Sequence, residues 1–480
     1  MSVSEETLTT SAELRTAPSA HRWPALSVVL TAAFMDLVDG TIVSVVLPRI
    51  QSDLGAGFAA AQWILAGYSL TFALMLITGG RLGDVFGRKR IFLIGVTGFT
   101  LASVVCGAAG DPVVLIVARL AQGLMAALMV PQVFSIIMVV FEPENRAKPF
   151  ALYGIVLSVA NISGPLLGAA LAEYNVFGLH WRAIFYVNVP IGLFALIGAA
   201  RYMPESRSEH PLKVDPPGIA LVSLASFALM FPLIQGREAG WPAWAFVMMA
   251  AALPILALFA LSQRRSGSPL VPLSLFSTRS FTVGLITLLV LFTGPASLFL
   301  VLNYGLQLGL GWSLITTALT GIGWPIGITM TSGIAQRFAT AHGRLMIRTG
   351  LLIMTVGMVV LIALMHGYGS DVSYPAIALP VLGMGLGMGL CVPILTNVIV
   401  ADVPADSAGA ASGVLNAVLQ LGTTAGIALV GVVFFALADG RGGESLYAAA
   451  PATLWYNASA FLVAALLASL LPRAVRAPRR

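Results

Sequence analysis

Charged residues are unusually scarce in this 480-residue chain. Charged residues make up 10% of the sequence and hydrophobic residues 58%, whereas an average soluble protein is about 25% charged. So few charges cannot cover the surface of a soluble domain of this length. The composition therefore excludes a soluble globular protein and predicts an all-α protein that crosses a membrane many times.

Cysteine is almost absent, and a signal peptide is missing. Cys106 and Cys391 both fall inside apolar stretches, so we expect two small packing residues rather than a disulfide framework or a metal site. Residues 1–22 lack a basic start and a short apolar core with a cleavage site. We expect them to form a disordered polar leader in the cytoplasm.

Fourteen apolar stretches are long enough to cross a bilayer core of about 30 Å. They lie near residues 25–47, 60–80, 91–110, 113–140, 148–172, 183–202, 216–235, 243–262, 280–306, 313–336, 344–366, 374–400, 407–438 and 452–472.

The basic residues of the loops predict an orientation. All but five of the 26 Lys and Arg residues fall in the leader, the tail or every second loop. The remaining loops hold only Arg49, Arg182, Arg237 and Arg441, and the fifth residue, Arg119, lies within a span. Because positively charged loops stay in the cytoplasm, both termini are predicted to be cytoplasmic. The net charge of +6 is thus a topology signal, and we expect no nucleic-acid partner.

The predicted spans contain almost no charge. Of the 20 Asp and Glu residues, only Asp36 and Asp39 lie deep within a span, and Arg119 is the only deep base. A charged side chain at the bilayer centre costs about 2.5–3.5 kcal/mol on the insertion scale and is functional by default. These three residues are therefore candidates for a functional centre.

Asp36 and Asp39 are three residues apart and so point to nearly the same face of a helix. Two carboxyls one turn apart in an apolar interior cannot both stay charged cheaply, so one of them is expected to take up and release protons. Approach and withdrawal of Arg119 would then couple proton flow to a conformational change. A buried ion pair that only fixes two helices is the structural alternative.

The stretch GGRLGDVFGRKR, residues 79–90, joins the second and third predicted spans. Its glycines are expected to permit a tight reversal and close helix approach, with Asp84 at a helix N-terminus. The stretch resembles the signature loop of the major facilitator superfamily. The resemblance implies a latch that holds one conformation without touching substrate, made of Gly83, Asp84, Gly87, Arg88 and Arg90.

Further stretches resemble the fourteen-span drug:proton antiporter branch of that superfamily. In chain order they are VDGTIVSVVLP (38–48), QWILAGYSL (62–70), ARLAQGLMAA (118–127), GIVLSVANISGPLLGAAL (154–171), WRAIFYVNVPIG (181–192) and ADVPADSAGAASGVLNAVLQLGTTAGIAL (401–429). Ser44 stands where the branch usually has Asn. The resemblance ties Arg119 to proton transfer and favours Asp39 as the coupling carboxyl. Asp36 is assigned either to the same role or to binding a cationic substrate.

The resemblance implies the major facilitator fold, with two six-helix bundles and two extra helices between them. The expected parts are the leader, an N-terminal bundle at 23–202, a linker with two spans at 203–279, a C-terminal bundle at 280–472 and a basic cytoplasmic tail at 473–480. In the fifth span, Gly164 and Gly168 form a small-xxx-small packing face and Pro165 predicts a kink. Gly154 belongs to the same antiporter motif.

Substrate contacts are predicted from the polar and aromatic residues of the spans, because apolar cavities with a few polar groups suit amphipathic compounds and aromatic faces suit cations. The candidates are Gln62, Trp63, Tyr68, Gln122, Asn161, Asn303, Tyr304, Trp324, Asn416 and Gln420. The last six predicted spans hold no deep acid, which argues against dicationic substrates.

The sequence therefore predicts a secondary transporter of a bacterial cytoplasmic membrane, not an enzyme. It would export drugs, antibiotics or lipophilic monocations in exchange for protons, with the proton as coupling ion and no cofactor, metal or ATP. Three alternatives remain: a lipid or lipid-conjugate exporter, a proton-coupled nutrient symporter, and a non-transporting sensor.

Overall fold

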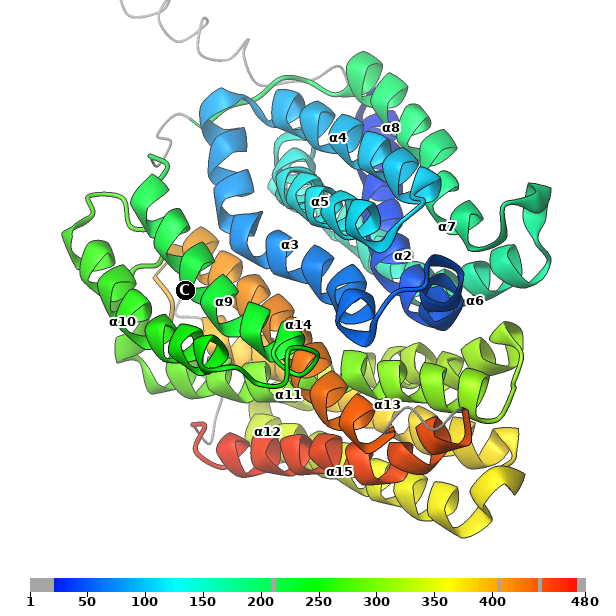
Figure 1. Cartoon of the computed structure of the whole chain (residues 1–480). Coiled ribbons are helices and arrows are strands. Elements are labelled where there is room, and N and C mark those ends of the chain that lie inside the picture. Colours follow the sequence, from blue (N-terminus) through cyan, green and yellow to red (C-terminus); the bar gives the residue numbers. More distant parts are fainter. Residues whose placement is uncertain (1–20, 209–212, 405–406, 439–442, 473–480) are drawn as a thin grey trace, which may run out of the picture.

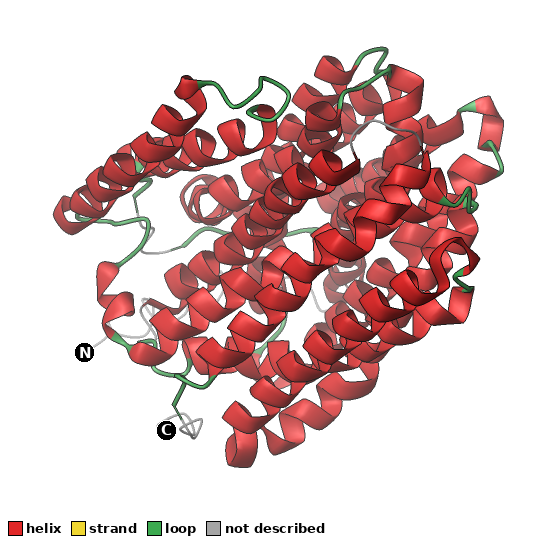
Figure 2. Cartoon of the chain, turned by 60° about the horizontal axis from the view of Figure 1, so that its bottom comes forward, coloured by secondary structure: helices red, strands yellow, loops and turns green. Residues whose placement is uncertain are grey.

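Membrane-length helices account for nearly all of the chain that the structure describes. The computed structural model describes residues 21–208, 213–404, 407–438 and 443–472. Within these ranges it holds 14 candidate membrane spans, as predicted, and no strand (Figure 2). Helices suit a bilayer because they satisfy every backbone hydrogen bond within the segment.

The helices follow the predicted spans closely. They are α2 (Arg22–Leu54), α3 (Phe58–Phe86), α4 (Arg88–Ala108), α5 (Pro112–Val140), α6 (Ala147–Glu173), α7 (Ala183–Tyr186), α8 (Asn188–Tyr202), α9 (Pro216–Gln235), α10 (Ala243–Arg265), α11 (Arg279–Tyr304), α12 (Leu314–Tyr368), α13 (Tyr374–Val400), α14 (Ala408–Ala438) and α15 (Gly443–Ala468). Short turns intervene at η2 (Pro143–Asn145), η3 (Val176–Gly178), η4 (His180–Arg182), η5 (Leu273–Ser277), η6 (Gly305–Gly309) and η7 (Gly369–Asp371).

Two spans share the label α12, because only a bend at His342 separates them. The last helix begins at Gly443, nine residues before the predicted start of its span. Since the number of spans is even, α2 begins and α15 ends on the same side of the membrane. That side is called the start face below, and the other is called the opposite face.

The helices pack as two groups with a pair beside them. Helices α2–α8 lie together in the upper part of Figure 1 and α11–α15 in the lower part. Helices α3 and α14 run along the seam between the groups, and α2 and α6 meet α11 and α12 there. The inserted pair α9–α10 lies to one side, with α9 against both α3 and α14.

The loop that joins α9 to α10 touches both groups at the opposite face. Glu238 accepts a hydrogen bond of 2.8 Å from the backbone N–H of Ala59 in the first turn of α3. Its neighbour Arg237 donates over 2.5 Å to the backbone oxygen of Phe435 in the last turn of α14. Each charge suits the helix end that it meets, an acid at an N-terminus and a base at a C-terminus.

The GGRLGDVFGRKR stretch differs from its prediction in one respect. Gly79, Gly80 and Gly83 lie inside α3, and only Gly87, with a φ of 111°, makes the reversal into α4. Asp84 therefore lies in the last turn of α3 and not at a helix N-terminus. A carboxylate is disfavoured at a helix C-terminus, and the adjacent Arg88 offsets this with an ion pair of 2.8 Å.

Helix α6 crosses α2 through the predicted small residues. A side chain at Gly164 would collide with Thr41 of α2, and a Cβ at Gly168 would lie 2.8 Å from the backbone oxygen of Ile42. Pro165 stands between them inside the helix. Gly154, assigned to the same packing motif, is exposed, and a Cβ added there would have no neighbour within 4 Å. It takes no part in this packing because the two helices meet only further along α6.

Gly168→Ala and Gly154→Ala form a matched pair that tests this contact. Gly168→Ala is expected to lower the free energy of unfolding by about 1–3 kcal/mol, because the backbone of α2 must move. Gly154→Ala is expected to be neutral or slightly stabilising, because alanine favours an exposed helix by up to about 1 kcal/mol. Thermal unfolding in detergent measures both. Equal losses of stability in the two variants would contradict the assigned packing.

Candidate functional site

Asp39 and Arg119 form an ion pair at the centre of the first helix group. Asp39 is 0% exposed and Arg119 is 1% exposed. Arg119 Nη1 of α5 donates to Asp39 Oδ2 of α2 over 2.5 Å. The two deepest charges that the sequence analysis identified are therefore brought into direct contact.

Two amides complete the environment of the Asp39 carboxylate. Gln122 Nε2 and Asn188 Nδ2 both donate to Asp39 Oδ1, over 2.9 and 2.7 Å. Both amides also reach Ser103 Oγ of α4, at 2.8 and 3.2 Å. The Asp39 carboxylate therefore accepts hydrogen bonds from one guanidinium and two amides.

Arg119 is held from two further sides. Its Nε donates over 3.2 Å to the backbone oxygen of Ile64, and its Nη1 also donates over 2.7 Å to Gln122 Oε1. The guanidinium carbon lies 4.4 Å from the centre of the Tyr68 ring, a cation–π distance. The base is thus fixed by α2, α3 and its own helix.

Asp36 lies one turn nearer the start face and in a different environment. It is only partly buried, and the Tyr68 hydroxyl donates to its Oδ1 over 2.5 Å. Tyr68 therefore links Asp36 to the base, with its hydroxyl on Asp36 and its ring on Arg119. Asp36 and Asp39 were predicted to point to the same face of the helix, and they do belong to one connected group of polar side chains. Only Asp39 contacts Arg119 directly.

Close packing of α3 against α5 makes this cluster possible. A side chain at Gly123 of α5 would collide with the backbone oxygen of Tyr68, and one at Gly67 of α3 would press on Leu120. Gly79 of α3 lies against the backbone of Ala127 in the same way. These glycines let the two backbones approach, so Arg119 of α5 reaches the Ile64 backbone oxygen and the Tyr68 ring of α3.

The remaining predicted substrate contacts divide by location. Asn161 and Asn416 are exposed on α6 and α14, and Gln420 is partly buried on α14. Trp63 and Trp324 are buried against Phe231 of α9 and Phe299 of α11, with ring centres 6.2 and 5.7 Å apart. These two tryptophans pack between helices in this structure.

Asn303 and Tyr304 close the seam at the opposite face. Both are buried near the end of α11 and bond to the last third of α2. The contacts are Asn303 to the Ser44 backbone oxygen at 2.8 Å, Tyr304 to Gln51 Oε1 at 2.5 Å and Gln307 to the Val45 backbone oxygen at 2.8 Å. Gln62 lies at the same seam, against Gly431 of α14. These hydrogen bonds join the two groups in the half of the molecule that is nearer the opposite face.

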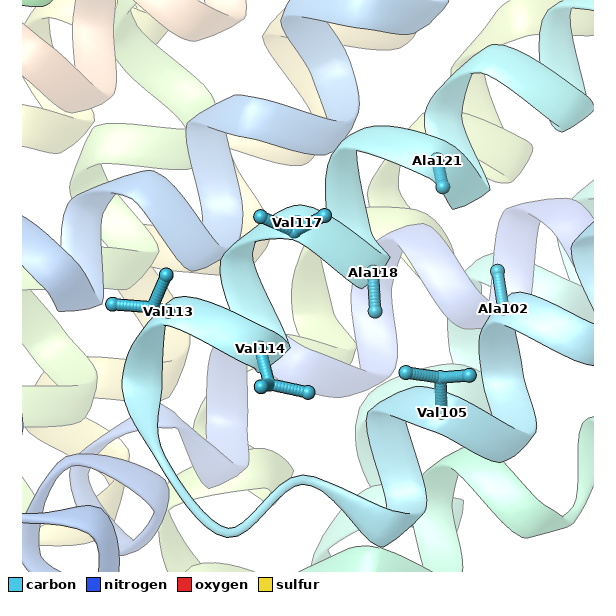
Figure 3. Close-up of a pocket in the computed structure, with 7 residues that line it drawn as sticks. All are labelled: Ala102, Val105, Val113, Val114, Val117, Ala118 and Ala121. Carbon is cyan, nitrogen blue, oxygen red and sulfur yellow. The ribbon is translucent and has the colours of Figure 1, made fainter.

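One concave region of the surface contains none of the cluster residues. It is an apolar groove of about 340 Å³ between α4 and α5, shown in Figure 3. Its lining is Ala102, Val105, Val113, Val114, Val117, Ala118 and Ala121. These residues offer no polar group to orient a ligand, so the groove is a lipid-facing surface.

The signature stretch also has a role that its sequence did not reveal. Arg81 is buried near the end of α3 and donates to the backbone oxygens of Lys213, Ser268 and Pro269. It therefore holds both connections of the inserted α9–α10 pair against α3 at the start face. Arg90, assigned to the latch, is exposed.

Sequence reasoning missed Asn188, Ser103 and Arg81. Asn188 lies in the quoted WRAIFYVNVPIG stretch, and its amide within an apolar run was an available signal. The charge census excluded it because an amide carries no charge. No group of three or more His, Cys, Asp or Glu residues that could hold a metal occurs in the described part of the chain.

Arg119→Leu tests whether the ion pair supports the fold. The variant leaves a buried carboxylate without a counter-charge, so the free energy of unfolding at pH 7 is expected to fall by about 3–5 kcal/mol. The loss should shrink on acidification, because protonation removes the uncompensated charge. Thermal unfolding across a pH series measures it. The double variant Asp39→Asn/Arg119→Leu buries no charge at these two positions. Its free energy of unfolding should therefore fall less than that of Arg119→Leu alone. A double variant that is less stable than the single one at pH 7 would refute this account.

Comparisons with known proteins give one consistent result. Residues 29–427 match the family model described as Major Facilitator Superfamily. The chain is 39% identical over 441 residues to the probable actinorhodin transporter of Streptomyces coelicolor, which covers 89% of this chain and 75% of that protein. It is 36% identical over 354 residues to the puromycin resistance protein pur8 of Streptomyces alboniger, covering 72% and 68%. It is 31% identical over 374 residues to the multidrug efflux pump LfrA of Mycolicibacterium smegmatis, covering 76% and 72%.

Solved structures share the fold at low sequence identity. A peptide transporter POT in complex with sulfate has a TM-score of 0.66 at 16% identity, covering 93% of this chain and 95% of that one. A D-xylose-proton symporter has a TM-score of 0.66 at 15% identity, covering 94% and 98%.

Proposed function

The chain belongs to the major facilitator superfamily, and from its buried charge cluster we propose that it exports small amphipathic organic compounds in exchange for protons. It is a multi-pass plasma-membrane transporter and not an enzyme. The proposal adds the direction of transport, the coupling ion and the class of substrate.

The observation that carries the proposal is the Asp39–Arg119 pair. Among the described residues, the buried charged side chains are Asp39, Arg119, Arg81 and Asp215, and the last two lie at the start-face ends of their helices. The second helix group has no buried charge within the described ranges. A proton-coupled step in the membrane interior therefore has one natural location, the first group.

The partly buried Asp36 provides a route to this centre. It lies on the start-face side of Asp39, and Tyr68 joins it to Arg119. A proton that loads at Asp36 and reaches Asp39 would weaken the attraction of Arg119 for α2. Since α2 also carries the closed seam at Ser44 and Gln51, such a change acts directly on the contact between the groups.

The start face is assigned to the cytoplasm. The connections and first helical turns at this face carry the basic residues Arg88, Lys89, Arg90, Arg146 and Lys148. Positively charged segments that flank the spans stay inside. The hydrogen-bonded half of the seam then faces outward. This arrangement supports a conformation that receives its substrate from the cytoplasm, as an exporter must before each transport step.

The substrate class is inferred from the relatives and from the site. Relatives are named for actinorhodin transport, puromycin resistance and multidrug efflux. The exposed Asn161 and Asn416 offer uncharged polar contacts on α6 and α14. We therefore assign antibiotics and lipophilic monocations to this chain, with the proton as coupling ion and without a cofactor.

The proposal is tested in proteoliposomes that contain a pH-sensitive dye. Addition of ethidium to the wild type is expected to move protons across the membrane in the direction opposite to ethidium. Asp39→Asn is expected to abolish this movement, because the neutral amide cannot release a proton. Asp371→Asn, at an exposed acid outside the cluster, is the matched control and should behave as the wild type.

Other outcomes would change the assignment. Proton movement that survives in Asp39→Asn would refute Asp39 as the coupling carboxyl and move this role to Asp36. Ethidium transport with no proton movement in the wild type would refute antiport. Transport of neither ethidium nor a broad panel of antibiotics would refute the substrate class and favour lipid export.

A further inference from the structure

Among the described residues of the buried cluster, Asn188 is the one with a fully buried polar atom that lacks a hydrogen-bond partner. The side chain is 1% exposed at the start of α8. Its Nδ2 donates to Asp39 Oδ1 and Ser103 Oγ, whereas its Oδ1 is buried without a hydrogen-bond partner among the described residues. Buried acceptors are nearly always bonded because an unmet one costs free energy. The exception therefore needs an explanation.

Gln122 provides the contrast. Its Oε1 accepts from Arg119 and its Nε2 donates to Asp39 and Ser103, so the amide is held at both ends. Turning the Gln122 amide would place its oxygen against the Asp39 carboxylate and its nitrogen against the guanidinium. Asn188 is held at its nitrogen only, and no described residue fixes its oxygen.

Protonation of Asp39 reverses what this carboxyl needs from its neighbours. The ionised carboxylate accepts hydrogen bonds at both oxygens, but a proton on Oδ1 needs an acceptor where Asn188 now presents a donor. A half-turn of the Asn188 amide about its last side-chain bond exchanges the nitrogen for the free oxygen. The same residue then accepts from the carboxyl that it previously donated to.

We propose that Asn188 is the positioning residue for the transported proton, with an amide that donates to ionised Asp39 and turns to accept from protonated Asp39. The inference rests on the proposed proton coupling and adds the residue that lets a fully buried carboxyl exist in both states. The proton is bound to Asp39 throughout, and Asn188 contributes only a hydrogen bond.

The other ionisable groups around Asp39 cannot take this role. Arg119 of α5 has no acceptor atom. Tyr68 of α3 directs its hydroxyl to Asp36, the second acid on α2 itself. Cys106 of α4 donates weakly to Gln122 Oε1 at 3.6 Å. Helix α8 contributes Asn188 to the surroundings of Asp39, and the side-chain oxygen of Asn188 has no partner among the described residues.

The second helix group contains a matched control. Asn457 of α15 is also fully buried, donates through Nδ2 to the Gly294 backbone oxygen and Ser297 Oγ of α11, and has an unpartnered Oδ1 among the described residues. Asn457 resembles Asn188 in its burial, in its two donated hydrogen bonds and in its unpartnered oxygen, but it donates to no ionisable group. Asn188→Leu and Asn457→Leu therefore separate a role in packing from a role in proton binding.

The first measurement compares two modes of ethidium transport in proteoliposomes. In Asn188→Leu, transport driven by a pH gradient is expected to fall about tenfold, the value of one charge-assisted hydrogen bond. Exchange of ethidium for ethidium at equal pH should stay within about twofold, because it needs no change in Asp39. Asn457→Leu should not separate the two modes. A parallel fall of both modes in Asn188→Leu would show a structural role and overturn the proposal.

The second measurement needs no transport activity, so it tests the inference even if proton antiport fails. Infrared difference spectra between neutral and acidic pH are recorded on protein with isotope-labelled asparagine. In the wild type, an asparagine carbonyl band is expected to move to lower frequency on acidification, as its oxygen gains a hydrogen bond. The shift should be absent from Asn188→Leu and present in Asn457→Leu.

Asp39→Asn keeps the second measurement decisive if Asn188→Leu does not fold. This variant retains Asn188 but has no proton to bind at position 39, so the band should not shift on acidification. A wild-type spectrum without the shift, or a shift that persists in either Asn188→Leu or Asp39→Asn, would overturn the proposal.

Discussion

A carboxylate and a guanidinium without access to water determine how the first helix group is built. Neither Asp39 nor Arg119 is tolerable alone in an apolar interior, because a lone buried charge costs several kcal/mol. The surrounding structure supplies what water would: two amides, a backbone oxygen and an aromatic face. The glycines of α3 and α5 contribute as well, because they bring the two backbones close enough for Arg119 to contact α3.

The second group repeats the packing plan without the charge. Its last span places Asn457 against Ser297 of α11, as α8 places Asn188 against Asp39 of α2. Gly426 of α14 lies on the backbone of Thr293, as Gly168 of α6 lies on Ile42. The two groups therefore share a scaffold of small residues and buried amides. Within the described ranges only the first has a buried ion pair, so the buried charge of the transporter is distributed asymmetrically although its packing is not.

The sequence predicted the spans well because apolar length is a strong local signal. It also identified Asp39 and Arg119, since a charge stands out against apolar neighbours. Asn188 escaped for the opposite reason: a neutral amide is common in membrane helices, and only its position in three dimensions makes it important. Asp84 was misplaced because glycines that seemed to form a turn instead lie inside α3, where they allow a close approach. Such contacts between distant segments leave no local pattern in the chain.

The inserted pair α9–α10 is bound unequally at its two ends. At the start face, Arg81 donates hydrogen bonds to both of its connections, so this end of the pair is attached to α3. At the opposite face, adjacent residues of one short loop hold α3 and α14 at once. If the two groups separate there, two adjacent residues cannot follow both, so one of these two hydrogen bonds has to break. The pair is thus anchored to the first group at the start face and bridges both groups at the opposite face, and this bridge has to open when the groups part there.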